Sequence, residues 1–100
     1  MTRSHLHLRA RPGRRDELLR ELDRLGLFVV TSEQPGLLRV EALVAQADEG
    51  HILVDASWSS QELFACWQSS DRRRSVLSSL NGLLESDPEE SAYRLVDAFG

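Results

Sequence analysis

The sequence contains no lysine, so all 12 of its cationic residues are arginines. Without a lysine amine the chain cannot form a Schiff base, which excludes an internal aldimine with pyridoxal phosphate. It also has a single cysteine, Cys66, which excludes an intramolecular disulfide framework and a thiolate metal cluster. Enzyme classes that depend on either chemistry are therefore excluded.

Long apolar runs are missing as well. No stretch approaches the roughly 20 apolar residues that a membrane-spanning helix needs, and the first ten residues lack the apolar core of a signal peptide. The formal net charge is -4, which argues against a nucleic-acid partner. We therefore expect a cytoplasmic protein that binds neither membranes nor nucleic acid.

The length of 100 residues predicts a single domain over residues 1–100. A chain of this size buries only about two-thirds of its unfolded surface, so its hydrophobic core is marginal. Small domains often gain stability by pairing, and we therefore expect a homodimer.

Two hydrophobic periodicities divide the first third of the chain. Polar and apolar residues alternate over 5–10, which predicts a half-buried strand. Apolar residues at helical spacing then predict an amphipathic helix from Arg14, with two acidic residues in its first turn. Gly26 offers one end for this helix, but we favour its continuation toward Ser32.

A hairpin and a helix follow. Alternating segments predict strands over 37–44 and 51–58, joined by a turn at 48–50. Ser59 and Glu62 have the S-x-x-E form of a capping box, which predicts a helix directly after Trp58.

The last third predicts a second helical segment and a final strand. Ser69 or Ser70 can cap a helix over 72–84, which Asn81-Gly82 can shorten. Residues 87–90 form a polar break, and 92–98 have the pattern of a strand.

The order strand, helix, strand, strand, helical pair, strand is typical of the ferredoxin-like α+β fold. In this fold helices cover one face of a four-stranded antiparallel sheet. Because both alternating sets of the second and third strands contain apolar residues, we expect the bare face to pack against a second copy.

Three segments carry a family resemblance over nearly the whole chain: RPG at 11–13 before the first helix, QPGLL at 34–38, and VDASWSS at 54–60. The chain thereby resembles the antibiotic biosynthesis monooxygenase superfamily of dimeric α+β barrel proteins. The resemblance implies a homodimer, a cavity between sheet and helices in each subunit, and a role in secondary metabolism. Members include cofactor-free oxygenases of anthrones and quinols, haem-degrading enzymes and proteins without oxygenase activity.

The chain matches the haem-degrading branch of this superfamily only in part. Such relatives carry a second tryptophan on the helix after the strand-end Trp58, and Trp67 matches it. They bind iron through a histidine about ten residues later, where this chain has Leu77, and no histidine follows His51. Without that ligand, haem would need a different anchor.

The chain resembles the cofactor-free branch of this superfamily more closely. Its anthrone-oxidising members resemble this chain in the strand-end Trp58, and their helical arginine can match Arg74 across a short gap. Their third-strand asparagine is replaced by Val54, and the adjacent Asp55 points to the opposite face of the strand.

His5 and His7 share one face of the first strand, and the resemblance implies that this face lines the cavity. A neutral imidazole there could accept a phenolic proton near pH 7. The alternative is a solvent-exposed or structurally hydrogen-bonded histidine. The pair supplies two metal ligands and no third is evident, so we expect no metal site.

The aromatic and cationic residues between 58 and 74 have two interpretations each. Trp58 and Trp67 could sandwich an aromatic substrate, with Phe64 one helical turn from Trp67, although an aromatic stripe at this spacing also forms core. Arg72 and Arg73 are expected on a solvated face, whereas Arg74 could stabilise an enolate.

Our leading hypothesis is a cofactor-independent monooxygenase that oxidises an electron-rich polycyclic phenol, anthrone or quinol with O2. It assigns catalysis to His7, Trp58 and Arg74, and substrate binding to His5, Phe64 and Trp67, with no cofactor and no metal. The alternative is a non-catalytic dimeric module that binds a small ligand or assists another enzyme, motivated by the missing asparagine.

Overall fold

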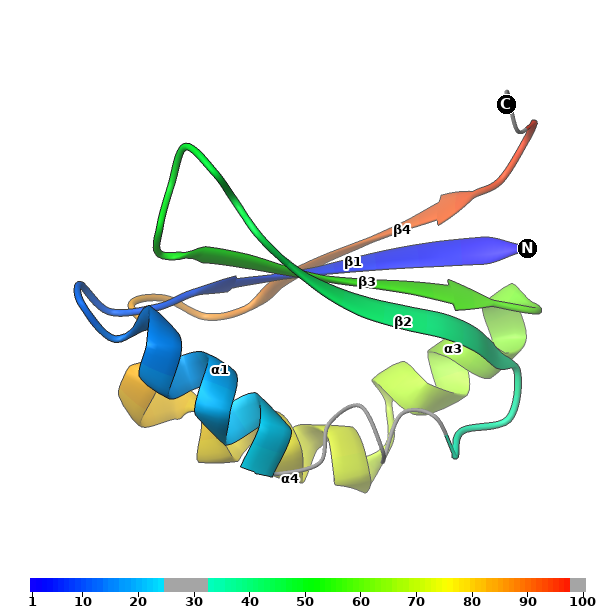
Figure 1. Ribbon diagram of the computed structural model, residues 1–100. Coiled ribbons are helices and arrows are strands. Elements are labelled where there is room, and N and C mark those ends of the chain that lie inside the picture. Colours follow the sequence, from blue (N-terminus) through cyan, green and yellow to red (C-terminus); the bar gives the residue numbers. More distant parts are fainter. Residues whose placement is uncertain (25–32, 98–100) are drawn as a thin grey trace.

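The structure is a computed structural model that describes residues 1–24 and 33–97. Its elements are β1 (Thr2–Arg9), α1 (Arg15–Arg24), β2 (Leu37–Val44), β3 (His51–Trp58), α3 (Gln61–Gln68), α4 (Asp71–Ser79), η1 (Asn81–Leu83) and β4 (Glu89–Arg94). The described strands form one antiparallel sheet in the order β2-β3-β1-β4. This arrangement confirms the expected ferredoxin-like α+β fold (Figure 1).

The sheet has two unlike faces. In Figure 1, α1, α3 and α4 lie together on one side, and no described helix covers the other. Side chains alternate along each strand, so the even-numbered residues of β1 and β3 are buried beneath the helices and most odd-numbered ones are only partly buried. We call the two sides the helix-covered face and the open face.

The core lies between the helix-covered face and the helices. Its most deeply buried side chains each expose 1% or less of their surface and come from β1, α1, β3 and the α4–η1 junction: Leu8, Leu18, Leu22, Ile52, Trp58 and Leu80. Burying one such side chain contributes about 1.5–3 kcal/mol to folding. The periodic leucines of the sequence therefore form the core as predicted.

The helix boundaries differ from the sequence predictions in detail. α3 begins at Gln61, and its cap is Ser60 rather than Ser59: the Leu63 N–H donates to Ser60 Oγ at 3.2 Å. Ser70 caps α4, as one of the two predicted candidates, and α4 ends at Ser79 before the short η1 helix. The predicted extension of the first helix toward Ser32 lies outside the described residues. No helix in the described ranges is long and apolar enough to cross a membrane.

The last strand is placed differently from the prediction. β4 spans Glu89–Arg94 instead of 92–98, because its backbone pairs with β1 from Glu89 opposite His7 to Arg94 opposite Thr2. An edge strand tolerates polar and charged side chains, so two glutamates do not prevent the pairing. Glu90, opposite Leu6, consequently belongs to the helix-covered face.

The turn before β2 requires glycine. Gly36 has φ +85°, and a Cβ at this position would lie 2.5 Å from Leu63 Cδ1. Its carbonyl accepts the Ser59 N–H at 2.7 Å, which ties the start of β2 to the end of β3. A register shift follows between Leu37 and Arg39, so Leu38 does not continue the predicted alternation and is exposed.

Candidate active site

A small pocket lies between the helix-covered face and helices α3 and α4. Its apolar wall comes from both layers: Leu6, Val40, Val54, Ala56, Trp67 and Leu77. Trp58, Ser4, Arg73 and Glu90 add polar atoms to this wall. An apolar pocket with a few convergent polar groups is the usual form of a small-molecule site.

The pocket occupies the place expected for the cavity but has little free space. Its volume is about 20 Å³, which is room for about one water molecule. A substrate with several fused rings therefore requires the lining side chains to move apart. Trp67 and Leu77 reach the pocket from the helical layer, so a shift of α3 or α4 away from the sheet would widen it.

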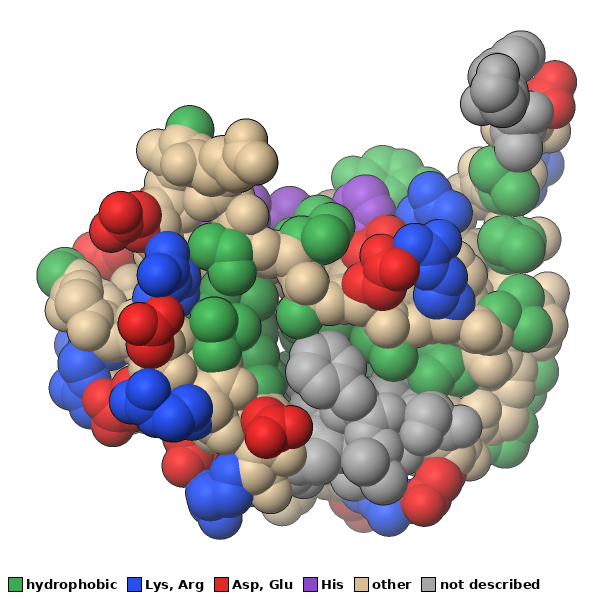
Figure 2. All heavy atoms as spheres, in the orientation of Figure 1, with side chains coloured by type: hydrophobic (Ala, Val, Ile, Leu, Met, Phe, Trp, Pro, Cys, Tyr) green, Lys and Arg blue, Asp and Glu red, His purple; other side chains and the backbone are tan. Residues whose placement is uncertain are grey.

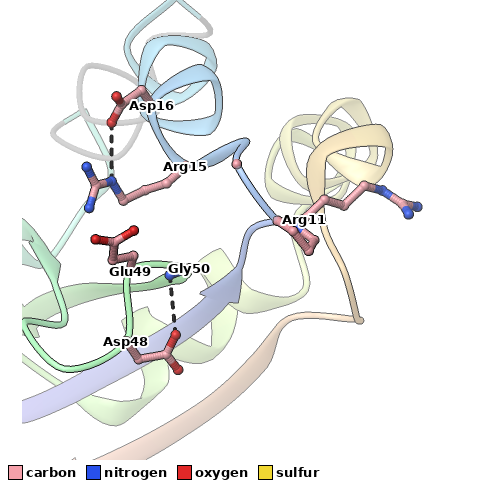
Figure 3. Close-up of a pocket in the computed structure, with 8 residues that line it drawn as sticks. Arg11, Arg15, Asp16, Asp48, Glu49 and Gly50 are labelled. Atoms are coloured by element: carbon pink, nitrogen blue, oxygen red, sulfur yellow. Dashed lines mark hydrogen bonds and ion pairs between the residues drawn. The ribbon is translucent and has the colours of Figure 1, made fainter.

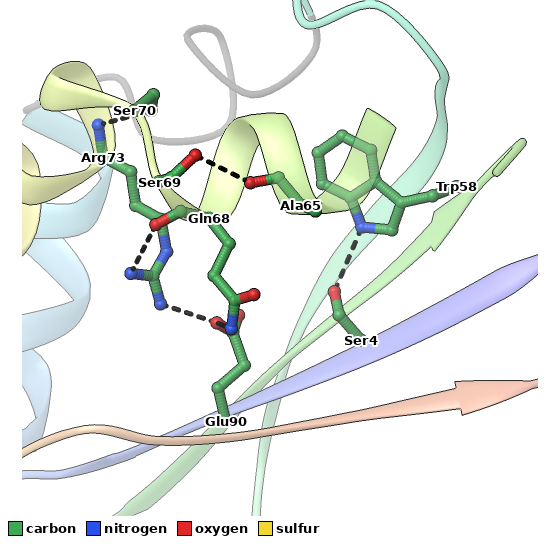
Figure 4. A network of polar contacts seen from close by, with 8 residues as sticks. All are labelled: Ser4, Trp58, Ala65, Gln68, Ser69, Ser70, Arg73 and Glu90. Atoms are coloured by element: carbon green, nitrogen blue, oxygen red, sulfur yellow. Dashed lines mark hydrogen bonds and ion pairs between the residues drawn. The ribbon is translucent and has the colours of Figure 1, made fainter. Parts of the chain in front are cut away.

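Trp58 forms a fixed aromatic wall. Its side chain is 1% exposed, and its indole N–H donates to Ser4 Oγ at 3.1 Å (Figure 4). Its ring also packs against Phe64 with 5.6 Å between centroids. Phe64 therefore supports Trp58 from within the core and does not line the pocket itself.

Arg73 and Glu90 form a largely buried ion pair across the pocket. Arg73 Nη2 lies 2.7 Å from Glu90 Oε1, and the two side chains are 17% and 11% exposed. Gln68 Nε2 donates to the same carboxylate oxygen at 3.1 Å (Figure 4). Burial raises the pKa of Glu90 above its usual value even though Arg73 and Gln68 act to lower it. Arg73 Nε is buried and makes no hydrogen bond within the described part of the chain.

The expectation that the face of His5 and His7 lines the cavity beneath the helices is wrong. Both are odd-numbered residues of β1 and lie on the open face, whereas Trp58 pairs with Thr2 and faces the helices. The neighbouring leucines of β1 are more apolar and occupy the core side of the strand. Side-chain alternation then directs the two histidines away from the pocket.

The predicted inward position of Arg74 is also wrong. Its side chain is 72% exposed and pairs with Asp71 one helical turn away, at 2.7 Å. Arg73 lies three residues before the buried Val76 and seven before the buried Leu80, so it shares their face of α4. The arginine that reaches the pocket is therefore Arg73, for which a solvated position was expected.

The open face carries its own polar network. His7 Nδ1 and His51 Nε2 are 2.9 Å apart with stacked rings. His5 Nε2 lies 3.2 Å from Asp55 Oδ1 and its ring is 5.2 Å from that of Tyr93. Asp55 thus faces away from the pocket, as predicted. No group of three or more metal-binding side chains occurs among the described residues.

Two larger hollows lie elsewhere on the surface of the described chain. One, of about 640 Å³, lies on the open face beside Tyr93 and Val96, where Val96 is 83% exposed. The other, of about 360 Å³, separates the β1–α1 turn from the β2–β3 hairpin (Figure 3). One of the charged residues that line it, Asp48, is paired within the fold: it binds Arg9 at 2.7 Å, and this contact lowers the pKa of Asp48.

The pocket does not fit haem. Haem iron is held by a histidine, cysteine, methionine or tyrosine side chain, and none of these types lines the pocket among the described residues. All three histidines of the chain lie on the open face, and Leu77 occupies the place of the iron-binding histidine of haem-degrading relatives.

Sequence reasoning missed three of the polar pocket residues. Ser4 follows the same alternation as Leu6 and Leu8, and Arg73 shares the spacing of Val76 and Leu80, so both had a detectable signal. Glu90 had none, because its segment has low strand propensity and was interpreted as a polar break.

The comparisons with known proteins agree with this architecture. The family model for antibiotic biosynthesis monooxygenase matches residues 1–77. Among solved structures, candidate antibiotic biosynthesis monooxygenases from Deinococcus radiodurans and Chloroflexus aurantiacus are 20% and 22% identical, with TM-scores of 0.83 and 0.71. Each match covers 100% of this chain, and 97% and 98% of the other chains.

A third solved structure is a mutant of SnoaB, a cofactor-independent oxygenase from Streptomyces nogalater. It is 15% identical with a TM-score of 0.78, over 97% of this chain and 94% of that chain. At these identities the structural likeness shows the fold alone. No curated protein matches the chain. Since the family model spans residues 1–77, well over half of the sequence, the chain belongs to the antibiotic biosynthesis monooxygenase family.

Proposed function

We propose that this chain is a cofactor-independent monooxygenase that oxidises an electron-rich polycyclic phenol, anthrone or quinol with O2 in the pocket at Trp58. The observation that carries the proposal is the combination of a rigid aromatic wall at Trp58 with a buried guanidinium at Arg73 in an otherwise apolar pocket. The naming of SnoaB as a cofactor-independent oxygenase supports the same reaction type.

The chemistry needs few protein groups. Loss of a proton from an anthrone gives an enolate, which can itself transfer an electron to O2. Recombination of the resulting radical with superoxide, followed by loss of water, places one oxygen atom in a quinone product. Arg73 would stabilise the oxyanion, the apolar wall would exclude water, and Trp58 would orient the rings by stacking.

We further propose that the active form is a homodimer joined through the open face. The face combines charged and polar side chains with apolar ones, and it continues into exposed Tyr93, Leu95 and Val96 at the end of the chain's last strand. Figure 2 shows green side chains grouped beside the purple histidines at the upper side of the molecule. A second copy packed against the open face would cover these apolar groups and remove them from water.

A non-catalytic role is the second candidate. Val54 lines the pocket in the place of the asparagine of anthrone-oxidising relatives, and the free volume is about 20 Å³. A protein that binds a small ligand without chemistry would need no such asparagine. The same purified protein can distinguish the two roles, because binding without O2 consumption supports only the second.

The test is O2 consumption by metal-free protein. Protein treated with a chelator is incubated with a panel of anthrones and hydroquinones, in air and under nitrogen, and the products are identified by mass spectrometry. We expect O2-dependent quinone formation that falls at least about 100-fold in Trp58→Ala, since a misplaced substrate loses about that much rate. Binding of panel members without turnover of any of them would refute the monooxygenase proposal.

A further inference from the structure

The proposed reaction begins with the removal of a proton, and the histidines expected to accept it lie on the other face of the sheet. Among the described residues, the pocket contains one carboxylate, that of Glu90. Neither the family match, which ends at residue 77, nor the sequence patterns drew attention to this residue. Its surroundings nevertheless have the features of a proton-accepting site.

The two oxygens of Glu90 are engaged unequally. Arg73 Nη2 and Gln68 Nε2 both donate to Oε1, at 2.7 and 3.1 Å. Oε2 makes no hydrogen bond with the rest of the described chain. The carboxylate is therefore held in place through one oxygen (Figure 4). The other oxygen could accept a hydrogen bond from a ligand in the pocket.

Arg73 shows a matching asymmetry. Its Nη2 binds Glu90, and its Nη1 donates to the Gln68 backbone carbonyl at 3.4 Å, which leaves the buried Nε–H without a partner among the described residues. Burying an unpaired N–H of a charged group is costly. An anionic oxygen of a bound substrate is the kind of acceptor that would satisfy it.

We propose that Glu90 is the general base of the reaction and that Arg73 balances the charge before and after the proton moves. This inference rests on the proposed monooxygenase function. The acidic C–H or phenolic O–H of the substrate gives its proton to Glu90 Oε2, and the electron pair stays on the substrate as an enolate or phenolate. Arg73 neutralises the carboxylate at the start and the substrate oxyanion afterwards, so the net charge of the pocket does not change.

Burial makes Glu90 a better proton acceptor. It raises the pKa of the carboxyl group above the usual value for glutamate, and this brings the group closer to the pKa of a phenol. A base works best when its pKa lies near the working pH, and such a group typically contributes 10²–10⁴-fold to the rate. The neighbouring Glu89 lacks these surroundings, because it is exposed and lies on the open face opposite His7.

The proposal can be tested without the oxidation step. Under nitrogen and in deuterium oxide, the wild-type protein should exchange the acidic carbon-bound hydrogen of an anthrone, measured by mass spectrometry. We expect Glu90→Gln to lower this exchange rate at least about 100-fold, with Glu89→Gln as an unchanged control. The wild-type rate should decline as the pH falls through the pKa of Glu90, because the protonated carboxyl cannot accept a proton, and Glu90→Gln should lack this decline.

Each outcome has a distinct meaning. Exchange that persists in Glu90→Gln with the same pH profile refutes Glu90 as the base and leaves the monooxygenase proposal standing. Absence of exchange and of turnover in the wild type refutes the monooxygenase proposal, and the base assignment with it. If Glu90→Gln does not fold, Glu90→Asp replaces it: a shorter carboxylate should slow exchange at least about tenfold while keeping the acidic decline, and an unchanged rate refutes the assignment.

Discussion

Arg73 and Arg74 are neighbours in the sequence but have opposite surroundings in the fold. Arg73 is 17% exposed in an ion pair with Glu90, and Arg74 is 72% exposed beside Asp71. The difference follows from the helical period, since adjacent residues of a helix point about 100° apart. Comparing their substitutions therefore separates a pocket residue from a surface residue of the same type.

We predict that Arg73→Met lowers kcat for anthrone oxidation by about 10²–10³-fold, because it removes the donor to the developing oxyanion. Arg74→Met should change kcat less than twofold, since exposed ion pairs contribute little. Initial rates of O2 uptake measure both effects, and circular dichroism checks folding. If Arg74→Met causes the larger loss, the placement of the site at Arg73 is wrong.

At the residue scale, the sequence predicted the types of side chain that line the pocket better than it predicted which numbered residues supply them. Trp58 and Trp67 both line the pocket, since a strand-end and a helical position both follow from local patterns. Their roles in catalysis and substrate binding stay predictions. Arg73, and not the predicted Arg74, reaches the pocket, because Arg73 shares the face of α4 that carries the buried Val76. His7 is predicted on the wrong side of the sheet, because strand alternation places it on the face opposite Trp58.

At the element scale, strands with an apolar face were predicted well and a polar edge strand was not. The bounds of β2 and β3 match the expected 37–44 and 51–58, because alternating apolar residues report burial directly. β4 contains Glu89, Glu90 and Ser91, which have low strand propensity, and it forms because β1 offers a free edge. This pairing is non-local, so no local sequence window reveals it.

The turn at Gly36 gives an element-scale prediction. Gly36→Ala should lower the free energy of unfolding by about 2–5 kcal/mol, since it adds a left-handed strain of about 1–2 kcal/mol to a clash of about 1–3 kcal/mol with Leu63. Gly82→Ala, where a Cβ meets nothing within 4 Å, is the matched control.

Urea unfolding of both variants measures the difference. Gly13 separates the two contributions, because it has φ +74° but a Cβ added there would meet no atom within 4 Å, so Gly13→Ala should show the strain alone. A Gly36→Ala protein as stable as Gly82→Ala would contradict the view that this turn requires glycine where it ties the start of β2 to the end of β3.

At the scale of the whole molecule, the open face is the main unexplained surface. The described helices all lie on one side of the sheet (Figure 1), and Leu53 is partly buried on the open face, in the central strand β3. A homodimer through this face would place Leu53 in an interface without disturbing the core.

We predict that the protein sediments with about twice its chain mass of 11.3 kDa. Leu53→Arg should shift it toward the monomer, because an unpaired charge in an interface is strongly unfavourable. Ala65→Arg, on the exposed side of α3, should leave the mass unchanged. A wild-type protein that stays at the mass of one chain at all accessible concentrations would contradict the dimer proposal.

The central claim is that chemistry takes place beneath the helices at Trp58 and Arg73, in a pocket that has about 20 Å³ free before a ligand binds. A crystal structure with a bound dihydroxyanthraquinone, which resembles the expected product, tests it most directly. The account predicts a ring system stacked against Trp58, an oxygen near Arg73 Nε and Glu90, and a pocket widened by displacement of Trp67 or Leu77. A ligand bound instead on the open face beside His5 and Tyr93, with the pocket still closed, would contradict it.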